Sequence, residues 1–362
     1  MSAEGLSEAR QAIDAIDRQL VQLLNERMRH VQRIGAVKAY SAQGVYAPAR
    51  EEQVIANLLA ANAGPLTERH LRAIWREIFA AARNLEEPQR VGYLGPAATF
   101  THQAALERFG AATEYVPLPT IPDVFREAAQ GHVHYGVVPV ENSTEGSVHE
   151  TLDAFAEFDL RVIAEIALGI HHQLVARVPR ERIRRVFTNP VALGQCRRWL
   201  AANLPGVELV TVVSTARAAA QAAETPDSAA IAPRLAAEVY GLDIVAADIE
   251  DLAANYTRFY VLAPTNNNPP TGRDKTAILF SVRHEVGALS AVVQQFAAAG
   301  INLTSIQSRP LRGRPWEYIF FVEFEGHAAE PNWQRALTAV TPRCLFLKVL
   351  GSWPRAVVAT AV

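Results

Sequence analysis

The N-terminal segment places cations on an otherwise apolar helical stripe. From Leu6 to about Ala39, apolar residues recur at three-and-four spacing with no proline, which predicts one long helix. Arg10, Arg27 and Lys38 lie on or beside that stripe, where a cation is costly unless an anion pairs with it. Arg27 and Lys38 are eleven residues apart, close to three helical turns, so their side chains could converge on one small dianion.

The length of this helix implies a second chain. At 1.5 Å per residue it would reach ~50 Å, which is too long for a small globular domain. Arg10 lies ~40 Å from Lys38 along the same rod, so an equivalent site that used Arg10 would be built with another subunit. We therefore expect a homodimer or a higher homo-oligomer. The alternative from spacing alone is a dimerisation module whose charges pair with one another or snorkel.

A second group of chemically useful residues follows the predicted strands of the middle segment. Residues 91–95 read as a buried strand before a turn with Thr99, and residues 134–141 lead to the run Asn-Ser-Thr-Glu-Gly-Ser at 142–147. We expect a helix to begin at each of these turns. Helix N-termini favour anions, and open α/β sheets bind ligands beyond the ends of their strands. The pattern indicates an anionic small molecule in a two-lobed crevice.

Metal and cofactor motifs are not found. His132, His134, His171 and His172 have no further ligand at metal-binding spacing, so we predict no metal site and read them as surface or structural residues. No GxGxxG follows the first strand, and GxxxxGK[ST], GxSxG and HExxH are absent, so we expect no cofactor. His172 begins the apolar strand 173–176 that opens the second lobe, which also makes it a candidate for the crevice wall.

Charge and composition exclude several classes of partner. The 362 residues carry 35 Lys+Arg and 37 Asp+Glu, a net charge of −2, so no basic field favours nucleic acid. No run approaches ~18 consecutive apolar residues, and the opening residues lack an export leader, so we expect neither membrane insertion nor export. Cys196 and Cys344 are far apart and offer no disulfide framework. The predicted location is the reducing cytoplasm.

Two breaker-rich linkers, at 86–89 and 264–272, divide the chain. The predicted domains are residues 1–88, 89–265 and 273–355. The first is expected to be all helical and, by the argument above, dimeric. Its second helix is expected from Pro48 and its third from about Leu66. The second alternates strands with helices, which predicts two α/β lobes.

The last domain has the element order βαββαβ, which predicts a ferredoxin-like α+β sandwich. The ferredoxin-like fold alone does not identify a ligand, so an inert oligomerisation domain is the alternative. The predicted strands are 275–282, 301–309, 316–324 and 344–350.

Charged and apolar positions of the helical segment form a recognisable pattern. It comprises Arg10, Ile13, Asp17, Leu20, Leu23, Leu24, Arg27, Ile34, Gly35, Lys38, Pro48, Arg50 and Glu51. The pattern resembles the all-helical chorismate mutase family, whose members are intertwined dimers. The resemblance implies that Arg10 of one chain, with Arg27, Lys38 and Arg50 of the other, holds the two carboxylates of chorismate, and that Glu51 accepts its hydroxyl. The reaction is a pericyclic rearrangement that needs a fixed conformer and positive charge near the developing oxygen, a role for Lys38.

Three positions depart from that family. Ala47 stands where members often have Asp, and Ala82 in the substrate site stands where they often have Ser. Glu86 stands where many members have Gln, whose amide donates to the ether oxygen of the substrate. A carboxylate cannot donate, so we expect Glu86 to act catalytically as the protonated acid, favoured by burial. Mutase activity should then fall as pH rises.

Three motifs occur in order in the middle segment. They are GPAATF at 95–100, VVPVENSTEGSV at 137–148 and NYTRF at 255–259. Together they closely resemble prephenate dehydratase, whose two lobes form a fold like that of periplasmic binding proteins. Ala98 stands where that family usually has Gly, and Thr101 stands where it often has Ser.

The dehydratase resemblance assigns roles to these residues. Prephenate loses its ring hydroxyl and its ring carboxylate in one aromatising step, so the enzyme needs a proton donor and no strong base. Thr257 is the predicted donor, because aromatisation supplies the driving force. Arg258 is expected to orient a carboxylate or the loop, and Phe259 to pack. The other predicted prephenate contacts are Thr99, Asn142, Ser143, Thr144, Ser147 and His172.

Turn and strand positions of the last segment form a third pattern. They are Gly287, Ala288, Leu289, Asn302, Gln307, Ser308, Arg309 and Pro310. They resemble the ACT domain of this enzyme family, which binds phenylalanine between subunits. The resemblance implies feedback inhibition by L-phenylalanine, with an effector affinity that could differ because members usually have Glu where Gln307 stands. The implied effector contacts are Gly287, Ala288, Leu289, Asn302, Gln307 and Ser308.

The resemblances together cover nearly the whole chain. They imply the family of bifunctional chorismate mutase/prephenate dehydratases (P-proteins), with chorismate and prephenate as substrates. Two alternatives stay open. The first is a dehydratase in which residues 1–87 form a dimerisation domain with an inactive mutase site. The second is a cytoplasmic amino-acid-binding regulator, against which Thr257 and the intact run 142–147 speak, since a pure binder needs no proton donor.

Overall fold

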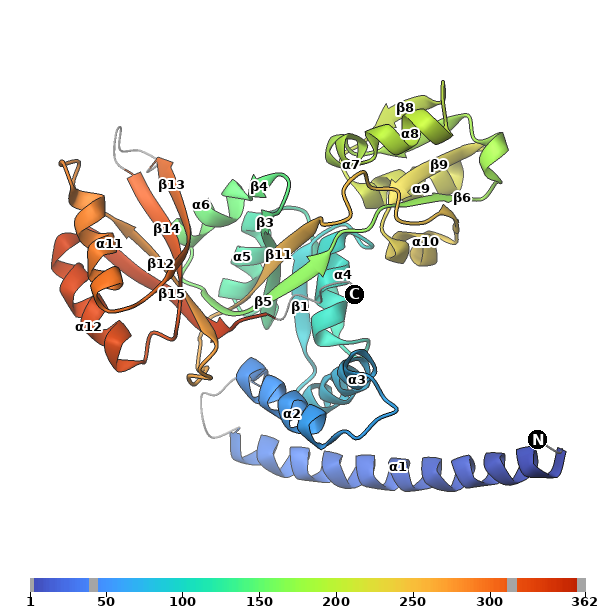
Figure 1. Cartoon of the computed structure of the whole chain (residues 1–362), viewed down its shortest axis with the longest axis horizontal. Helices are drawn as coiled ribbons and strands as arrows, with labels where there is room; N and C mark the ends of the chain where they lie inside the picture. Colours follow the sequence, from blue (N-terminus) through green and yellow to red (C-terminus); the bar gives the residue numbers. More distant parts are fainter. Residues whose placement is uncertain (1–2, 39–44, 311–317, 357–362) are drawn as a thin grey trace.

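The chain forms three units in sequence order (Figure 1). The computed structural model describes residues 3–38, 45–310 and 318–356. A helical unit comes first, a two-lobed α/β unit follows, and a smaller α+β unit ends the described chain. This order confirms the predicted fold classes.

The helical unit is built on one long helix. It consists of α1 (Ala3–Lys38), α2 (Pro48–Ala61) and α3 (Glu68–Glu86), in agreement with the predicted helices. Pro48 begins α2, where its missing N–H needs no partner, and Thr67 caps α3 by accepting from a backbone N–H. Figure 1 shows the N-terminal half of α1 extending past α2 and α3. No described helix, α1 included, has the length and apolar content that a membrane span requires.

The first lobe of the middle unit is a mixed sheet with helices. Its strands follow the order β2-β1-β3-β11-β5, with β4 paired to β3. β1 pairs in parallel with β2 and β3, whereas β11 pairs antiparallel with β3 and β5. The elements are β1 (Arg90–Leu94), α4 (Phe100–Phe109), β2 (Glu114–Leu118), α5 (Ile121–Ala129), β3 (Tyr135–Asn142), β4 (Gly146–Ser147), α6 (His149–Glu157), β5 (Arg161–Gly169) and β11 (Tyr256–Ala263).

The second lobe is inserted between β5 and β11, so the chain crosses between the lobes twice. Its sheet has the order β10-β6-β9-β7-β8 and is packed with alanine-rich helices. The elements are β6 (Gln173–Ala176), η1 (Arg180–Arg182), β7 (Arg185–Thr188), α7 (Pro190–Gln195), α8 (Arg197–Asn203), β8 (Glu208–Thr211), α9 (Thr215–Glu224), β9 (Ser228–Ala232), α10 (Arg234–Tyr240) and β10 (Asp243–Ala246).

The helix start predicted near Thr99 is confirmed, and the one predicted at 142–147 is wrong. Thr99 caps α4, as expected. The run 142–147 instead forms a tight hairpin in which β4 returns along β3, and α6 begins only at His149. The reason is local: Asn142 Oδ1 accepts from two backbone N–H groups of the turn, which closes the hairpin.

The last unit confirms the predicted βαββαβ order. Its antiparallel sheet has the order β13-β14-β12-β15, and α11 and α12 pack on one face. The predicted strand 316–324 begins outside the described residues and continues as β14. The elements are β12 (Asp274–Ser281), α11 (Ala288–Ala298), β13 (Leu303–Pro310), β14 (Tyr318–Glu325), α12 (Pro331–Val340), η2 (Thr341–Arg343) and β15 (Phe346–Pro354).

The opposite face of this sheet packs on the first lobe. The Phe155 and Phe321 ring centroids are 6.1 Å apart, and those of Tyr260 and Trp353 are 5.2 Å apart. Side chains of both units form one continuous buried cluster. The last unit and the strand that carries Thr257 therefore share a hydrophobic core.

Candidate active and effector sites

Thr257 and Asn142 lie side by side on two paired strands. β11 runs antiparallel to β3, so that Thr257 opposes Asn142 and Arg258 opposes Glu141. The register shifts directly after these two pairs, which leaves one extra residue in β3. A bulge of this kind changes which face the following side chains occupy. It turns Asn142 to the same side as Thr257.

A closed ring of hydrogen bonds joins the two lobes at this point. Asn142 Nδ2 donates to Thr257 Oγ1 at 2.8 Å and to Asn255 Oδ1 at 2.9 Å. Asn255 Nδ2 donates to Gln195 Oε1 at 3.0 Å, and Gln195 Nε2 donates to Thr144 Oγ1 at 3.0 Å. Thr144 Oγ1 completes the ring by donating to Asn142 Oδ1 at 2.6 Å. Because Gln195 ends α7 of the second lobe, the ring ties both lobes to Thr257.

The ring leaves the hydroxyl proton of Thr257 available. Thr257 Oγ1 accepts from Asn142, and no hydrogen bond from its own O–H to another described residue is found. A hydroxyl has one proton and two lone pairs, so this arrangement frees the O–H to point at a bound molecule. The geometry is that of a proton donor held by a fixed neighbour.

His172 supports the ring from the first crossover between the lobes. The residue is 2% exposed, and its Nε2 lies 2.8 Å from Gln195 Oε1. Since that oxygen can only accept, Nε2 carries the proton, and the buried Nδ1 has no hydrogen-bond partner among the described residues. Burial lowers the pKa of His172, although the hydrogen bond to Gln195 opposes the shift. The imidazole is therefore held in its neutral form.

The other predicted prephenate contacts occupy the surrounding loops and core. Thr99 Oγ1 donates to the last backbone carbonyl of β1 at 3.1 Å, and Ser143 Oγ accepts from the first backbone N–H of β11 at 3.0 Å. Ser147 lies half-buried on β4. Phe259 is 1% exposed in the core of the first lobe. The two hydroxyl groups therefore hold the loops beside the ring, and Phe259 packs.

Arg258 does not join this group. Its guanidinium bonds Glu141 and Glu165 of the middle unit and Glu323 of the last unit. The sequence led us to expect that Arg258 orients a substrate carboxylate or the loop. In the structure its donors are occupied by three carboxylates of the protein, on the side of β11 that packs against the last unit.

The helical unit gathers part of the predicted chorismate site. The Arg27 guanidinium lies over the Phe79 ring, 5.7 Å from its centroid, and its Nη1 is buried with no hydrogen-bond partner among the described residues. Burial lowers the pKa of Arg27, and the Glu51 carboxylate opposes that shift. A buried cationic N–H without an acceptor is costly, so this position favours a bound anion.

Other mutase candidates lie along α1 and α3. Glu86 is half-buried, and a Cβ added to Gly35 would lie 3.1 Å from its Cγ, so glycine permits the close approach of the two helices. Ala82 is buried one turn earlier on α3. Arg10 is exposed near the other end of α1. Lys38 is the last residue of α1, and its side chain lies outside the described part of the chain.

Arg83 is a residue that our sequence reasoning missed. Its side chain is 4% exposed, forms an ion pair with Glu51, and donates from Nη2 to the Phe109 carbonyl at 3.0 Å. The guanidinium also lies over the Tyr46 ring, 5.3 Å from the centroid. Arg83 thus joins a predicted chorismate contact to the first lobe. Its one sequence indication is its place four residues after Phe79, on the buried face of α3.

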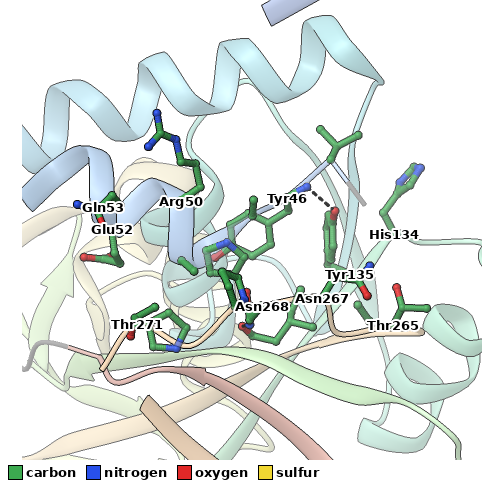
Figure 2. A pocket seen from close by; sticks show the side chains of 18 of the residues that line it. Tyr46, Arg50, Glu52, Gln53, His134, Tyr135, Thr265, Asn267, Asn268 and Thr271 are labelled. Atoms are coloured by element: carbon green, nitrogen blue, oxygen red, sulfur yellow. Dashed lines mark hydrogen bonds between the residues drawn. The ribbon is translucent and has the colours of Figure 1, made fainter. Parts of the chain in front are cut away.

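Arg50 lines a separate pocket of about 1020 Å³ between α2, the first lobe and the linker after β11 (Figure 2). Its polar wall includes Glu52, Asn267 and Asn268. Arg50 is the only predicted site residue among those that line it, and Thr257 is not. The pocket is therefore distinct from the hydrogen-bonded ring.

The predicted effector residues lie at two places on the last unit. Gly287 and residues 288–289 form the turn into α11, where a φ of +79° at Gly287 requires a glycine-like conformation. Gln307 and Ser308 lie on β13, and Asn302 precedes that strand. β13 is an edge strand of the sheet. An edge strand can pair with another chain.

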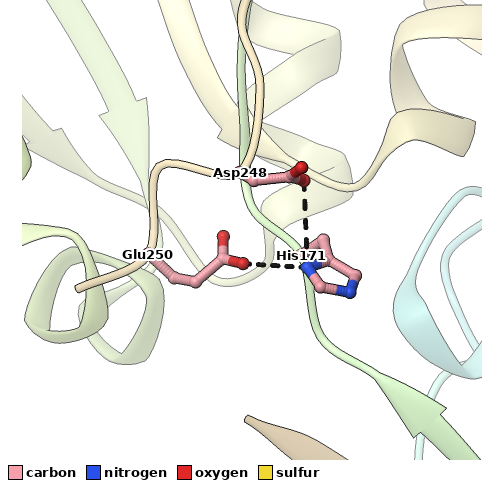
Figure 3. Close-up of side chains that lie close together, drawn as sticks. All are labelled: His171, Asp248 and Glu250. Atoms are coloured by element: carbon pink, nitrogen blue, oxygen red, sulfur yellow. Dashed lines mark hydrogen bonds and ion pairs between the residues drawn. The ribbon is translucent and has the colours of Figure 1, made fainter. Parts of the chain in front are cut away.

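One cluster of potential metal ligands lies on the segments that connect the lobes (Figure 3). His171 Nδ1 is 2.8 Å from Glu250 Oε1 and 3.8 Å from Asp248 Oδ1. We predicted no metal site, because the two carboxylates are far from His171 in sequence. Each carboxylate already has a protein donor: Glu250 accepts from the His172 N–H and Asp248 from the Gln173 amide. These bonds hold the cluster together, and we assign no metal to it.

Family comparisons cover the three units in order. Residues 9–87 match the chorismate mutase type II family, residues 91–267 match prephenate dehydratase, and residues 276–340 match the ACT domain. A bifunctional chorismate mutase/prephenate dehydratase of Aquifex aeolicus is 44% identical over 358 residues, covering 98% of this chain and 99% of the relative. One of Pseudomonas aeruginosa is 42% identical over 359 residues, covering 97% and 98%.

A solved structure agrees with the dehydratase and ACT units. The prephenate dehydratase of Arthrobacter aurescens in complex with L-Phe is 35% identical, with a TM-score of 0.69, covering 75% of this chain and 93% of that chain. The fold and these matches define a three-domain enzyme that joins a mutase, a dehydratase and an ACT domain. The chain belongs to the bifunctional chorismate mutase/prephenate dehydratase family.

The neutral state of His172 predicts a pH-dependent stability. Folding lowers the pKa of His172, so the unfolded chain takes up the proton first as pH falls. The folded state therefore loses stability relative to the unfolded chain as pH falls below about 6.5, the ordinary pKa of histidine. His172→Gln keeps a donor for Gln195 without titrating, and it should lose less stability between pH 7 and pH 5 than the wild type. Urea unfolding of the full chain at several pH values measures this. Equal losses in the two proteins would contradict the assignment.

Proposed function

We propose that Thr257 is the proton donor in the conversion of prephenate to phenylpyruvate. The observation that carries this role is the hydrogen bond from Asn142 Nδ2 to Thr257 Oγ1, which orients the hydroxyl and leaves its proton available. As the ring C–O bond breaks, Thr257 protonates the departing oxygen to form water. The bond to the ring carboxylate breaks at the same time, CO₂ leaves, and its electron pair completes the aromatic ring. Thr257 then regains a proton from water.

The loops around the ring are proposed to bind the two carboxylates of prephenate. Thr99 brings a hydroxyl group from the turn between β1 and α4, Ser143 and Ser147 bring theirs from the hairpin of β3 and β4, and Thr144 belongs to the ring itself. Neutral hydroxyl and amide donors can hold the ring carboxylate without a fixed cation beside it. A cation would stabilise that carboxylate and oppose its loss as CO₂. Neutral binding therefore suits a decarboxylating reaction.

Replacing Thr257 tests the proposed donor. Thr257→Ala should lower dehydratase kcat by about 100-fold or more, because a positioned general acid contributes at least that factor. Thr257→Ser, which keeps a hydroxyl, should retain much more activity. Urea unfolding of the full chain, compared with that of the wild type, serves as the folding control. A folded Thr257→Ala enzyme within a few-fold of wild-type turnover would exclude this role.

The helical domain is proposed to rearrange chorismate to prephenate. Arg27 offers a buried N–H without a partner among the described residues, next to Glu51. Glu86 and Lys38 lie at the adjoining ends of α3 and α1. Arg50 precedes Glu51 on α2 and stays a proposed contact. Separate assays on chorismate and on prephenate distinguish this proposal from a dehydratase with an inactive mutase domain.

Glu86 is proposed to donate to the ether oxygen of chorismate as the neutral acid. Wild-type mutase kcat should then fall as pH rises, because the ionised carboxylate cannot donate. Glu86→Gln supplies an amide donor at every pH, so its rate should stay level over the same range. Steady-state rates on chorismate from pH 5 to pH 9 measure the difference. Two superimposable, flat profiles would rule out the protonated acid.

A homodimer is proposed from the surface of α1. Ile13, Ile16, Leu20 and Leu23 are each at least 50% exposed in the single chain. Leaving such a row in water is unfavourable, since burying each side chain gains roughly 1.5–3 kcal/mol. A second copy placed along α1 would cover the row and bring its Arg10 to the site of this chain. The proposed mutase site is incomplete without it.

Complementation tests the shared mutase site. Arg10→Ala and Arg27→Ala should each lose mutase activity, because each removes one cation from both sites of a dimer. Coexpression in equal amounts should restore about a quarter of wild-type mutase activity: half of the dimers are mixed, and each mixed dimer has one intact site. Dehydratase rate normalises the amount of protein. Two inactive variants that fail to restore each other would show that Arg10 acts within its own chain.

The ACT domain is proposed to bind L-phenylalanine and inhibit the dehydratase. Support comes from the turn at Gly287, the open edge of β13, and the Arthrobacter aurescens structure with L-Phe.

The cytoplasm is proposed as the location. Cys196 and Cys344 are both free thiols, which fits a reducing compartment.

A further inference from the structure

A buried ionic cluster joins the strands of the active site to the ACT domain. Arg258 lies at its centre: Nη2 is 2.8 Å from Glu141 Oε2, and Nη1 is 3.1 Å from Glu165 Oε2. Both terminal nitrogens also bond Glu323, each at 3.0 Å from one of its oxygens. Glu141 and Glu165 belong to β3 and β5, whereas Glu323 belongs to β14 of the ACT domain. This two-pronged contact fixes the orientation of Glu323 relative to Arg258.

Further groups from both domains hold Glu323 in place. Lys275 on β12 has its Nζ 3.5 Å from Glu323 Oε2 and 3.2 Å from Glu165 Oε2. Tyr260, two residues after Arg258 on β11, donates its hydroxyl proton to Glu323. Two residues of β11 therefore contact the same carboxylate of the ACT domain.

The Glu323 and Glu165 carboxylates of the cluster are shielded from water, and the charges of the cluster depend on one another. The side chains of Glu323 and Glu165 are 1% and 3% exposed, and that of Arg258 is 21% exposed. Burial alone would raise the pKa of Glu323, but the cations of Arg258 and Lys275 outweigh it and hold the pKa below its usual value. Loss of one buried partner leaves the others with uncompensated charge. The arrangement therefore responds strongly to the position of Glu323.

The same strand positions carry the proposed reaction chemistry. Arg258 directly follows Thr257, and Glu141 directly precedes Asn142. The two pairs are neighbours in the ladder between β11 and β3. A displacement of Glu323 thus acts on side chains that are one peptide unit away from the Asn142–Thr257 hydrogen bond.

We propose that Arg258 is a positioning residue that couples the ACT domain to Thr257. Its ion pair with Glu323 holds β11 and β3 in the arrangement in which Asn142 orients the Thr257 hydroxyl. A change in the ACT domain on effector binding alters this pair and so changes the rate of the dehydratase. This inference rests on the proposed role of Thr257, and it gives the proposed feedback a physical route.

A second ion pair between the same two domains provides a matched control. Arg309 on β13 bonds Asp153 on α6 through two contacts of 2.9 Å. Neither residue lies on β3 or β11. Asp153→Asn therefore weakens the contact between the domains without touching the strands of the active site.

The test compares Glu323→Gln with Asp153→Asn in the full chain, measured as dehydratase kcat, KM and inhibition by saturating L-phenylalanine. Glu323→Gln keeps the size of the side chain and removes its charge. It should lower kcat at least tenfold with KM for prephenate within threefold, and it should reduce the fold-inhibition at least threefold. Asp153→Asn should leave kcat and KM within twofold of wild type. A purely structural role would not separate kcat from KM in this way.

A cooperative urea unfolding transition like that of the wild-type full chain shows that each variant is folded. If Glu323→Gln lacks it, Glu323→Asp replaces that variant, with a threefold loss of kcat as the criterion. The inference is overturned if the Glu323 variant keeps wild-type kcat, or if Asp153→Asn changes kcat equally. Retained activity in Thr257→Ala would instead overturn the proposed reaction chemistry, and a wild-type rate insensitive to L-phenylalanine would overturn the proposed feedback. The failures are therefore distinguishable.

Discussion

The pairing of β11 with β3 is the constraint on which the dehydratase and its regulation depend. Side chains alternate along a strand, so Thr257 and Arg258 face opposite sides of β11. Val140 of β3 lies in the core shared with the ACT domain, and simple alternation would send Asn142 to that side as well. The bulge places Glu141 there instead and returns Asn142 to Thr257. One pair of strands thus presents the proton donor on one face and the interdomain ion pair on the other.

The elements and the reacting groups could be predicted from the sequence because they depend on local pattern. Apolar spacing in α1, the proline at the start of α2 and the cap at Thr99 are each set by residues within a few positions of one another. Motif order then placed Thr257 and Asn142 in one site, and the structure brings them to 2.8 Å. The run 142–147 was misread as a helix start, since its turn chemistry serves a hairpin equally well.

Contacts between distant segments could not be predicted in the same way. The sequence leaves Arg258 open between orienting a substrate carboxylate and orienting the loop, because the face it occupies depends on the register of β11 and on Glu323, 65 residues away in another domain. Gln195 and Arg83 show no motif of their own, yet one closes the ring between the lobes and the other ties Glu51 to the first lobe. In each case tertiary packing assigns a role to an ordinary polar residue.

Amide hydrogen exchange of β11 tests most directly whether one strand serves both the active site and the ACT domain. The peptide that spans residues 256–260 would be followed in the full chain with and without saturating L-phenylalanine. We expect L-phenylalanine to change exchange in this peptide and Glu323→Gln to abolish the change, because the ion pair transmits it. A response to L-phenylalanine confined to the ACT domain, or one that Glu323→Gln leaves intact, would contradict this expectation.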